Sequence, residues 1–392
     1  MNLLFIQGGS RLKLAENGRW YTDGNFSVDV GERYTAVCDK LIIALRREKE
    51  VYTVEEAEKR YNIIPFSDNI EVIALDDITV PKTNVINPIV RIRIHKKIAE
   101  AVSKCDKAII RSGSHYTIEC YKECIKQHKP YLLEVAGLVK EGLANHSLLG
   151  KFTANYFENV FIKMARDSSH AIYVTEEALQ RRYPSNGKML GCSDVQLEDI
   201  DDNVLAYRLE KIKEDKERIV VGTAAFLDVK WKGQENVIKA IAELKAKGIN
   251  NIYYELVGIG KGSRLRKLAE KLGVTDRIIF LGAKPHEEIF EWLRHIDIYI
   301  QSSYQEGLCR SIVEAMSCAC PVICSDIGGN YELIDRDFLF PCGDYKMLAE
   351  LIVKMPQKSS EQAILNFRKA KKYNKDLLSL KRNQFFEDFL KS

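Results

Sequence analysis

Short apolar runs alternate with longer amphipathic runs along most of the 392-residue chain. This alternation is typical of parallel strands joined by helices that cover both faces of a sheet. The expected fold is therefore α/β, with two Rossmann-like, doubly wound parallel-sheet domains that face each other across a cleft. Strands are predicted over residues 3–6, 70–74, 107–111, 131–135, 171–174, 219–223, 252–257, 278–281, 296–301 and 322–324. Helices are predicted over residues 37–47, 94–103, 118–128, 234–247, 263–272, 287–294 and 309–318.

An acidic stretch over residues 198–217 separates the two halves of the chain. It holds eight carboxylates and few apolar residues, which predicts a solvated linker. We therefore expect an N-terminal domain over residues 1–197 and a C-terminal domain over residues 218–356. The tail over residues 357–392 is expected to be helical and to pack back on the N-terminal domain, because it carries an apolar stripe of Phe385, Phe386, Phe389 and Leu390.

Composition excludes several classes of protein. The 59 Lys and Arg residues nearly balance the 55 Asp and Glu residues, which argues against a nucleic-acid partner. No apolar run is long enough to predict a membrane-spanning helix, and the first residues lack the basic start of a secretory leader. The ten cysteines form no C-x-x-C pair and are expected to be reduced thiols. The expected location is the cytoplasm.

Residues 302–316 carry the most specific chemical signal. Glu306 and Gly307 follow a predicted strand and are expected to open a helix, whose first N–H groups attract anions. Glu306 and Glu314 would then lie about 12 Å apart on one side of that helix. A nucleotide sugar has the matching layout, with hexose hydroxyls for Glu306, a diphosphate for the helix N-terminus and a ribose diol for Glu314. The simpler alternative is a first-turn glutamate favoured by the helix dipole and a second, solvated glutamate.

The segment from Glu306 to Glu314, with residues 321–329 after it, resembles the E-x7-E signature of retaining glycosyltransferases. The resemblance is to family four, the glycosyl transferases group 1, which have the two-domain GT-B fold. Further motifs of that family are similar to residues 221–223, Lys232-Gly233, Gly258-Ile259-Gly260 and residues 280–282 of this chain, and to Gly8-Gly9 at its amino end.

The resemblance implies that the N-terminal domain binds an acceptor and the C-terminal domain binds a nucleotide sugar. It implies that Glu306 and Lys232 act in catalysis, with the charge of Lys232 on the departing diphosphate, so that neither a metal ion nor a cofactor is expected. An ordinary surface lysine remains the alternative for Lys232, and a plain turn the alternative for residues 282–285. The expected donor contacts are Gly8, Gly9, Lys230, Gly258, Gly260, Ala283, Lys284, Gly307, Leu308, Cys309, Arg310 and Glu314.

Two positions depart from the family pattern. Phe226 stands where the family usually has an arginine, about six residues before the lysine. Neutralisation of the diphosphate would then depend on Lys232, with help from Lys230 or Arg310. Cys320 stands where the family tends to have glycine, so we expect no positive φ there.

Residues near the expected cleft complete the set of candidates in the N-terminal domain. His115 follows a predicted strand and is expected to orient the donor or the acceptor as a catalytic residue, although an ordinary loop histidine is the alternative. Asp23 and Asn25 lie in a long loop, which we assign to acceptor binding. The D-x-D pairs at residues 199–201 and 335–337 are of the number expected by chance and predict no metal site.

The leading hypothesis is a retaining glycosyltransferase that moves a sugar from a nucleotide diphosphate donor, with a UDP-sugar favoured. The acceptor would be a saccharide or a lipid-linked saccharide, in the biosynthesis of a surface polysaccharide or another glycan. One alternative is a sugar-nucleotide epimerase of the same fold. The other is a catalytically silent partner subunit that binds a nucleotide sugar or a glycan.

Residues 85–97 mix apolar side chains with four Lys and Arg residues and contain no acid. Such a segment suits the surface of an anionic membrane, to which each basic residue contributes about 1 kcal/mol. A peripheral contact with the inner face of a membrane is therefore one hypothesis. The alternative is the edge of a buried helix whose cations extend to solvent.

Overall fold

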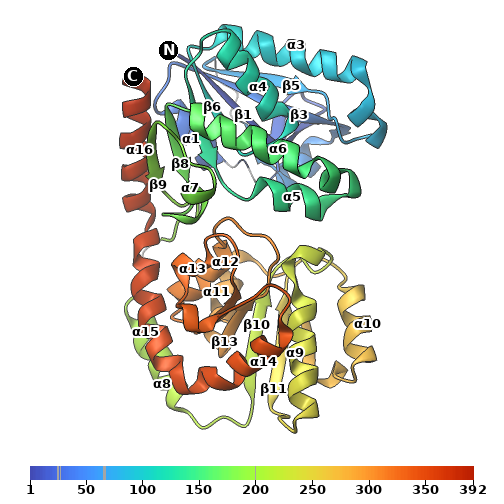
Figure 1. Cartoon of the computed structure of the whole chain (residues 1–392), viewed down its shortest axis with the longest axis vertical. Coiled ribbons are helices and arrows are strands. Elements are labelled where there is room, and N and C mark those ends of the chain that lie inside the picture. The colour runs from blue at the N-terminus through green and yellow to red at the C-terminus, as the bar shows by residue number, and fades with distance from the viewer. Residues whose placement is uncertain (24–25, 27, 65–67, 199) are drawn as a thin grey trace. The chain divides into compact units, whose positions relative to one another are not determined.

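The structure, a computed structural model, describes residues 1–23, 26, 28–64, 68–198 and 200–392 (Figure 1). The chain divides into two units of contacting residues. Unit 1 holds Met1–Tyr173, Gln180–Gly191 and Lys381–Ser392. Unit 2 holds Val174–Leu179 and Cys192–Leu380.

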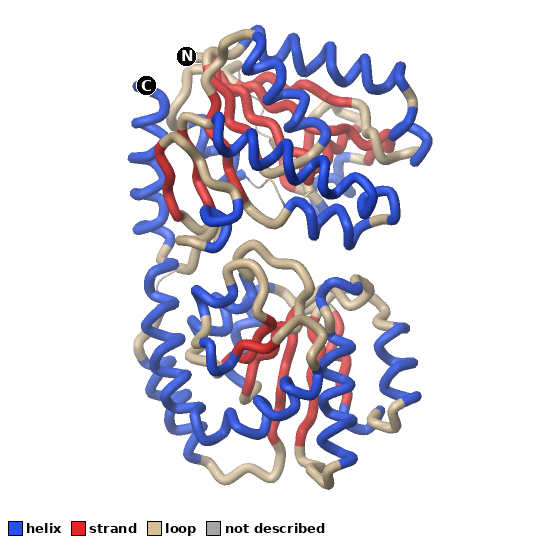
Figure 2. Tube along the Cα trace, in the orientation of Figure 1, coloured by secondary structure: helices blue, strands red, loops and turns tan. Residues whose placement is uncertain are grey.

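Unit 1 is built on a parallel sheet. The chain winds outward from β1 in one direction and from β6 in the other, so the winding reverses between these two neighbours (Figures 1 and 2). Ligands of such sheets bind beyond the carboxyl ends of the strands at this reversal, the switch point. The parallel strands follow the order β5 (Ile70–Leu75), β3 (Lys40–Tyr52), β1 (Asn2–Ala15), β6 (Lys107–Arg111), β7 (Tyr131–Val135), β8 (His170–Tyr173) and β9 (Lys188–Gly191), with β2 (Trp20–Thr22) and β4 (Asn62–Ile63) added antiparallel.

Helices cover this sheet on both faces. Helices α3, α4 and α6, which precede β6, β7 and β8 in the chain, pack side by side on one face. The right-handed crossover from β1 to β3 places α1 on the opposite face. The ring of Tyr34 in α1 lies 5.7 Å from the ring of Phe386, so the last turns of α16 pack there as well. The helices that lie wholly in unit 1 are α1 (Val28–Thr35), α2 (Val54–Arg60), α3 (Pro88–Lys104), α4 (His115–Lys126), α5 (Val139–His146) and α6 (Leu148–Asp167), and those that lie partly in it are α7 (Ala178–Arg182) and α16 (Lys375–Lys391).

Two sequence predictions for unit 1 are wrong. The helix expected over residues 37–47 is instead strand β3, because Leu41–Leu45 are five consecutive buried residues, as in a strand covered on both faces. The loop expected at Gly8 and Gly9 is an irregular part of β1. The register between β1 and β3 shifts between Ile6 and Arg11, and the strand then continues to Ala15.

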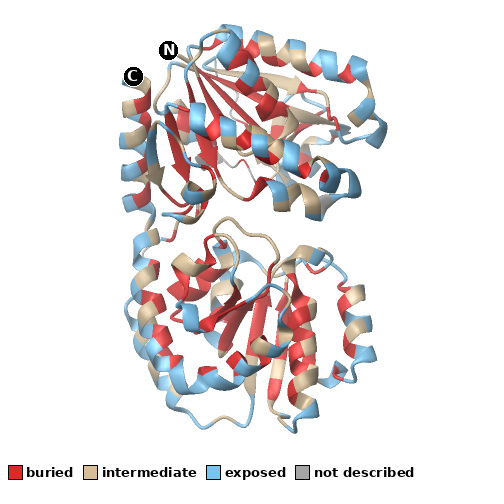
Figure 3. Cartoon of the chain, in the orientation of Figure 1, coloured by how far each residue is buried: buried red, intermediate tan, exposed pale blue. Residues whose placement is uncertain are grey.

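Unit 2 contains a second parallel sheet, whose winding reverses between β10 and β13. Its central strands are buried, its edge strand β12 is partly exposed, and the outer faces of its helices are exposed (Figure 3). Helices α9, α10 and α14 pack on one face, and α8, α12 and α15 pack against one another on the other. The strand order is β12 (Ile278–Gly282), β11 (Ile252–Val257), β10 (Ile219–Ala224), β13 (Ile298–Gln301), β14 (Val322–Ser325) and β15 (Leu339–Phe340). The helices are α8 (Asn203–Lys213), α9 (Gln234–Ala246), α10 (Ser263–Lys271), α11 (His286–His295), α12 (Arg310–Ser317), α13 (Asn330–Leu333), α14 (Tyr345–Lys354) and α15 (Ser359–Ala370).

The predicted solvated linker over residues 198–217 is largely the helix α8 of unit 2. Arg208 of this helix is buried and donates hydrogen bonds to the carbonyl oxygens of Leu293, at 2.6 Å, and Ile296, at 2.7 Å. These carbonyls end α11 and lead into β13. The acidic composition of the segment describes its exposed face, whereas one buried arginine anchors the helix.

The predicted tail over residues 357–392 is divided between the two units. Helix α15 belongs to unit 2, where Ala363 and Phe367 pack on Ala319, and Asn366 Nδ2 donates to Cys320 O at 3.1 Å. Only residues from Lys381 onward belong to unit 1, where Phe386 and Phe389 are buried. No helix in the described part of the chain is long and apolar enough to cross a membrane.

The contacts of Arg208 give a test of this assignment. Arg208→Leu removes the charged donor of the buried Leu293 carbonyl and leaves Ile296 O only the longer hydrogen bond from Lys211 Nζ, at 3.4 Å, so we expect unit 2 to lose about 3 kcal/mol of stability. Tyr207→Ala, on the exposed side of the same helix, should change stability by no more than about 0.5 kcal/mol. Urea unfolding of the two variants measures the difference, and equal unfolding curves would contradict an anchoring role.

Candidate active site

Lys232 and Glu306 meet at the switch point of unit 2. Lys232 lies in the loop that follows β10, and Glu306 lies in the loop that follows β13, the adjacent strand. Lys232 Nζ donates to Glu306 Oε1 at 2.7 Å. The two residues therefore stand where an open α/β sheet binds its ligand.

Glu306 is held through one of its two oxygens. Its Oε1 accepts from Ser303 Oγ at 2.7 Å and from Gln301 Nε2 at 3.3 Å, in addition to Lys232. Gln301 is itself fixed, because Tyr299 OH donates to Gln301 Oε1 at 2.8 Å. Within the described residues Glu306 Oε2 has no hydrogen-bond partner, so this oxygen is available to a ligand.

Lys232 is charged at neutral pH. Burial lowers the pKa of Lys232, but the negative charge of Glu306 and its hydrogen bond outweigh burial and raise the pKa above its ordinary value. An ammonium group has three N–H donors, and Glu306 occupies one of them. Lys232 therefore keeps both its charge and donor capacity for an anionic ligand.

The loops that carry the pair are pressed together at the level of the backbone. Tyr304 N donates to Trp231 O at 2.8 Å, and Ser302 Oγ donates to Gly233 O at 2.7 Å. Gly233 has φ of +66°, and a Cβ there would collide with Ser302 O. Only glycine meets both requirements, and its conformation sets the distance between Lys232 and Glu306.

A second contact fixes the other side of the Glu306 loop. Gly329 N donates to Gly307 O at 2.7 Å. Gly328 has φ of +57°, and a Cβ there would collide with Glu306 O. The turn after β14 therefore packs directly on the backbone of Glu306 and Gly307.

The predicted start of the helix at Glu306 is wrong. Helix α12 begins at Arg310, with Cys309 as its N-cap residue, and Glu306 and Gly307 lie in the loop before it. The side-chain and backbone contacts of this loop replace helical hydrogen bonds, so the helical geometry expected between Glu306 and Glu314 does not apply. Glu314 lies on α12 and is buried, with Oε1 at 3.1 Å from Nε2 of His286.

The amino end of α12 gathers further predicted donor contacts. Gly307, Leu308 and Cys309 form the approach to the helix, and Arg310 is exposed at its first position. The N–H groups of this first turn lack intrahelical partners and favour an anion. Burial raises the pKa of the Cys309 thiol to about 12, so Cys309 is not an ionised nucleophile.

The remaining predicted donor contacts follow the neighbouring strands of the same sheet. Gly258 and Gly260 lie after β11, and this loop meets the loop after β10 through a hydrogen bond from Leu227 N to Ile259 O at 2.9 Å. Ala283 and Lys284 follow β12, where Lys284 Nζ donates to Glu288 Oε2 at 2.9 Å. Lys230 is exposed, on the same short 3-10 helix as Lys232.

The two departures from the family pattern differ in their structural effect. Phe226 is 58% exposed on the loop that carries Lys232, and its side chain offers no charge to a ligand. Cys320 is buried and, as expected, does not have a positive φ; the adjacent Ala319 does, with φ of +50°.

In unit 1, His115 is a predicted catalytic residue, and Gly8 and Gly9 are predicted donor contacts. His115 lies in the first turn of α4 after β6, and Gly8 packs so closely on Ser114 that a Cβ would collide with its side chain, so both lie at the switch point of unit 1. His115 Nε2 is buried without a hydrogen-bond partner among the described residues, and burial lowers the pKa of His115. Gly9 accepts a hydrogen bond from Arg46 through its carbonyl oxygen, at 3.1 Å.

The two predicted acceptor residues have different outcomes. Asp23 Oδ2 accepts from Arg11 N at 3.2 Å, which attaches Asp23 to β1. Asn25 lies outside the described residues. The structure brings Lys232 and Glu306, the predicted catalytic pair, and most of the predicted donor contacts together within unit 2. In the described part of the chain, no three His, Cys, Asp or Glu side chains are grouped to hold a metal ion.

Comparison with known proteins agrees with this geometry. The family model for glycosyl transferases group 1 matches residues 208–372. Protein CapJ from Staphylococcus aureus is 30% identical over 402 aligned positions, which cover 100% of this chain and 96% of that protein. The chain belongs to the glycosyl transferases group 1. The predicted family is thereby confirmed.

Other relatives and solved structures support the family and the fold. The amylovoran biosynthesis glycosyltransferase AmsK of Erwinia amylovora is 32% identical over 136 residues, 32% of this chain and 33% of that protein. The structure of Anabaena HepE in complex with UDP has a TM-score of 0.62 at 18% identity and covers 100% of both chains. WaaG, a glycosyltransferase involved in lipopolysaccharide biosynthesis, has a TM-score of 0.59 at 15% identity and 98% coverage of both chains. The predicted α/β class with Rossmann-like GT-B domains is confirmed.

Sequence reasoning missed the residues that position Glu306 in this glycosyltransferase. Gln301 and Ser303 hold its carboxylate, and the pair Gly328 and Gly329 holds its backbone. The signal for Gln301 was a polar residue at the end of an apolar strand, which requires a buried partner. The signal for the glycine pair was its place directly after strand β14, where a tight turn faces the ligand edge.

Gly233 and Gly248 provide a matched test of the loop contact. Both have a positive φ, but nothing lies within 4 Å of a Cβ at Gly248, whereas a Cβ at Gly233 meets the backbone of Ser302. We expect Gly248→Ala to cost about 1 kcal/mol and Gly233→Ala to cost at least about 3 kcal/mol while separating Lys232 from Glu306. Urea unfolding gives the energies, and equal losses in the two variants would contradict the proposed backbone contact.

Proposed function

We propose that this protein transfers a sugar, with retention of configuration and without a metal ion, from a nucleotide diphosphate donor to a saccharide or lipid-linked saccharide. A UDP-sugar is the favoured donor, and the biosynthesis of a surface polysaccharide is the favoured role. The observation that supports this most is the Lys232–Glu306 pair at the switch point of unit 2. It combines a fixed cation with a carboxylate that has a free oxygen.

In this proposal the donor lies along the loops that follow β10, β13 and β14. The diphosphate would accept hydrogen bonds from Lys232 and from the first turn of α12, beside Arg310. Glu306 Oε2 would accept hydrogen bonds from hydroxyls of the transferred sugar. Glu314, which is buried and contacts His286, would bind the ribose diol, so His286 must share or release Glu314 Oε1.

The chemistry follows from where charge develops. When the anomeric bond breaks, negative charge accumulates on the departing diphosphate, and the ammonium group of Lys232 stabilises it as a metal ion would. Glu306 Oε1 already accepts three hydrogen bonds, which makes this carboxylate a weak nucleophile. We therefore favour attack by the acceptor hydroxyl on the face that the diphosphate leaves, with a diphosphate oxygen taking the hydroxyl proton.

His115 contributes a neutral nitrogen to unit 1 in this proposal. Its Nε2 has no partner among the described residues, and its lowered pKa keeps the ring uncharged at neutral pH. A neutral imidazole suits a hydrogen bond with a sugar hydroxyl. We assign it the role of orienting the donor sugar or the acceptor.

The names of related proteins support the finer assignments. Two neighbouring structures are Anabaena HepE with UDP and with UDP-glucose. AmsK is named for amylovoran biosynthesis, and LpsB of Rhizobium meliloti, 35% identical over 72 residues, is named a lipopolysaccharide core biosynthesis mannosyltransferase. These names favour a UDP-sugar and a polysaccharide product.

The structure of residues 85–97 is compatible with a membrane contact. Val90 and Ile94 of α3 are buried in the core, whereas Ile86, Ile89 and Ile92 are 79%, 63% and 54% exposed. Arg91 and Arg93 flank Ile92, and Lys96 follows them, all at exposed positions. We propose that this surface contacts an anionic membrane, where a lipid-linked acceptor would reside.

The pair is tested by Lys232→Ala and Glu306→Gln. Each variant removes an interaction with charge or hydroxyls at the reacting centre, so we expect sugar transfer to fall at least about 100-fold. Lys267→Ala, an exposed lysine of the same unit, should transfer normally. Release of nucleotide from UDP-, GDP- and ADP-sugars with a saccharide acceptor mixture measures the rate. Full activity in both site variants would overturn the proposed mechanism.

Donor choice and metal independence are tested by ligand protection. UDP at about 100 times its dissociation constant should stabilise the protein by about 2.7 kcal/mol, a rise of about 5 to 10 °C in Tm. We expect GDP and ADP to protect less, and the chelator EDTA to change neither UDP protection nor transfer. Equal protection by the three nucleotides would reject the preference for UDP, and loss of transfer in EDTA would reject the metal-free mechanism.

A further inference from the structure

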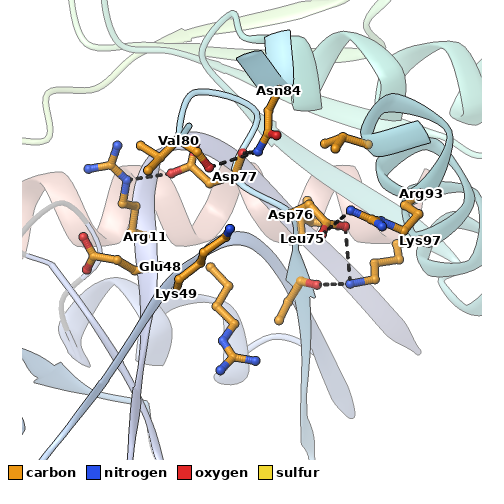
Figure 4. Close-up of a pocket in the computed structure, with 13 residues that line it drawn as sticks. Arg11, Glu48, Lys49, Leu75, Asp76, Asp77, Val80, Asn84, Arg93 and Lys97 are labelled. Atoms are coloured by element: carbon orange, nitrogen blue, oxygen red, sulfur yellow. Dashed lines mark hydrogen bonds and ion pairs between the residues drawn. The ribbon is translucent and has the colours of Figure 1, made fainter. Parts of the chain in front are cut away.

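Unit 1 contains a cavity of about 550 Å³ that none of the predicted acceptor residues lines (Figure 4). Its walls come from β1, β3, the end of β5 and the segment that follows it, and α3. The volume falls in the range of pockets that bind small molecules. The cavity lies at the carboxyl edge of the sheet, beyond the end of the edge strand β5 and away from the switch point between β1 and β6.

The charges around the cavity are unbalanced. Three carboxylates line it, from Glu48, Asp76 and Asp77. Five cations line it, from the three elements β1, β3 and α3: Arg11, Arg47, Lys49, Arg93 and Lys97.

The carboxylates are already engaged with the protein. Asp77 accepts from Arg11 Nε at 2.9 Å and from Thr79 N at 2.7 Å. Burial alone would raise the pKa of Asp77, but the hydrogen bonds from Thr79 and the nearby arginines lower it, so Asp77 stays ionised.

The two other carboxylates also face cations. Asp76 Oδ1 accepts from Arg93 Nη2 at 3.3 Å, and Asp76 Oδ2, which has no hydrogen-bond partner among the described residues, lies 3.9 Å from Lys97 Nζ. Glu48 pairs with Lys13 and accepts from Tyr52 OH at 3.1 Å. No carboxylate of the cavity wall is therefore left to neutralise a further cation.

Two of the cations are not engaged. Within the described residues, neither Lys49 nor Arg47 forms an ion pair or a hydrogen bond, and Arg47 Nε is buried without a partner. Arg47 stacks over the ring of Trp20, with its guanidinium carbon 5.5 Å from the ring centre. The stacking holds the guanidinium in place while its N–H donors remain free. Lys49 extends between the Arg11–Asp77 pair and the Asp76 group in the view of Figure 4.

The wall also has an apolar part, from Leu75, Val80 and Val90. A bare inorganic ion would not use this surface. A phosphate ester would, because its phosphoryl oxygens match the free N–H donors and its organic group covers the apolar side chains.

We propose that this cavity binds the phosphoryl group of a phosphate or diphosphate ester, held by Lys49 and Arg47. Its role as the acceptor site rests on the proposed function, in which the phosphorylated molecule is the acceptor. Binding itself depends only on the charges of unit 1. The ester is either a lipid-linked diphosphate or a soluble sugar phosphate, which share this chemistry.

The test uses the full chain with its donor site saturated by UDP, so that added phosphoryl groups report on the cavity. Inorganic pyrophosphate, geranyl diphosphate and glucose 1-phosphate are titrated in turn by isothermal calorimetry. We expect at least one of the two esters to bind more tightly than pyrophosphate. Lys49→Glu, at an exposed position, should weaken that binding about tenfold or more. Lys151→Glu should leave it unchanged, because Lys151 is an exposed lysine elsewhere in unit 1 whose side chain forms no ion pair or hydrogen bond within the described residues.

The arms of the experiment separate the two sources of the ester. Tighter binding of geranyl diphosphate identifies a lipid-linked ligand, and tighter binding of glucose 1-phosphate identifies a soluble one. Absence of binding for all three probes, or equal affinity in the Lys49→Glu and Lys151→Glu proteins, overturns the proposal. If UDP itself fails to bind, the proposed donor function fails. Titration of the same three probes into the Lys232→Ala protein without UDP then still shows whether the cavity binds a phosphoryl group.

Discussion

The ion pair between Lys232 and Glu306 holds the candidate active site of unit 2 together. It joins loops from β10 and β13, which are neighbours in the sheet but far apart in the sequence. Removing either charge would leave the other partly buried and unpaired, which is costly. Because Glu306 is satisfied through Oε1 alone, the pair leaves a carboxylate oxygen and ammonium N–H groups for a ligand. The glycines at 233 and 328 serve this contact, since any side chain there would push the loops apart.

The switch points of the two units differ in the groups that they present. Unit 2 places the Lys232–Glu306 pair and the amino end of α12 beyond its central strands, whereas unit 1 places there the Arg111–Glu134 pair and the neutral ring of His115, whose Nε2 has no hydrogen-bond partner among the described residues. In the proposed function, the diphosphate binds in the first environment and a sugar hydroxyl meets His115 in the second. The excess positive charge of unit 1 lies instead around the cavity by β3 and β5, where it would select a substrate by a group remote from the reacting hydroxyl. Binding energy from such a remote group contributes to orientation of the reacting atoms.

Local pattern predicted the strands of unit 2 closely. The strands from β10 to β14 differ from the expected ranges only at their ends, because each is a short apolar run bounded by turn residues. Glu306 and Lys232 were singled out through two separate short motifs, each contained in one stretch of the chain, and the structure brings the two side chains together. The errors arose where tertiary packing decides: β3 has an apolar run that fits a helix or a buried strand, and α8 depends on Arg208, whose partners lie about 85 residues away. The hydrogen bonds that keep Glu306 in the loop before α12 also depend on tertiary packing, so the sequence did not predict them.

Phe226 gives the ion pair an added importance. Without an arginine on this loop, Lys232 is the cation that pairs with Glu306, and in the empty site the two charges cancel. Attraction for a diphosphate then comes from Arg310 and the first turn of α12 until Glu306 finds other donors. In the proposed function, hydroxyls of the transferred sugar are those donors. When these hydroxyls bind Glu306, they weaken the ion pair between Glu306 and Lys232. The charge of Lys232 then becomes available to the diphosphate. Recognition of the sugar and neutralisation of the leaving group are thereby coupled through one contact.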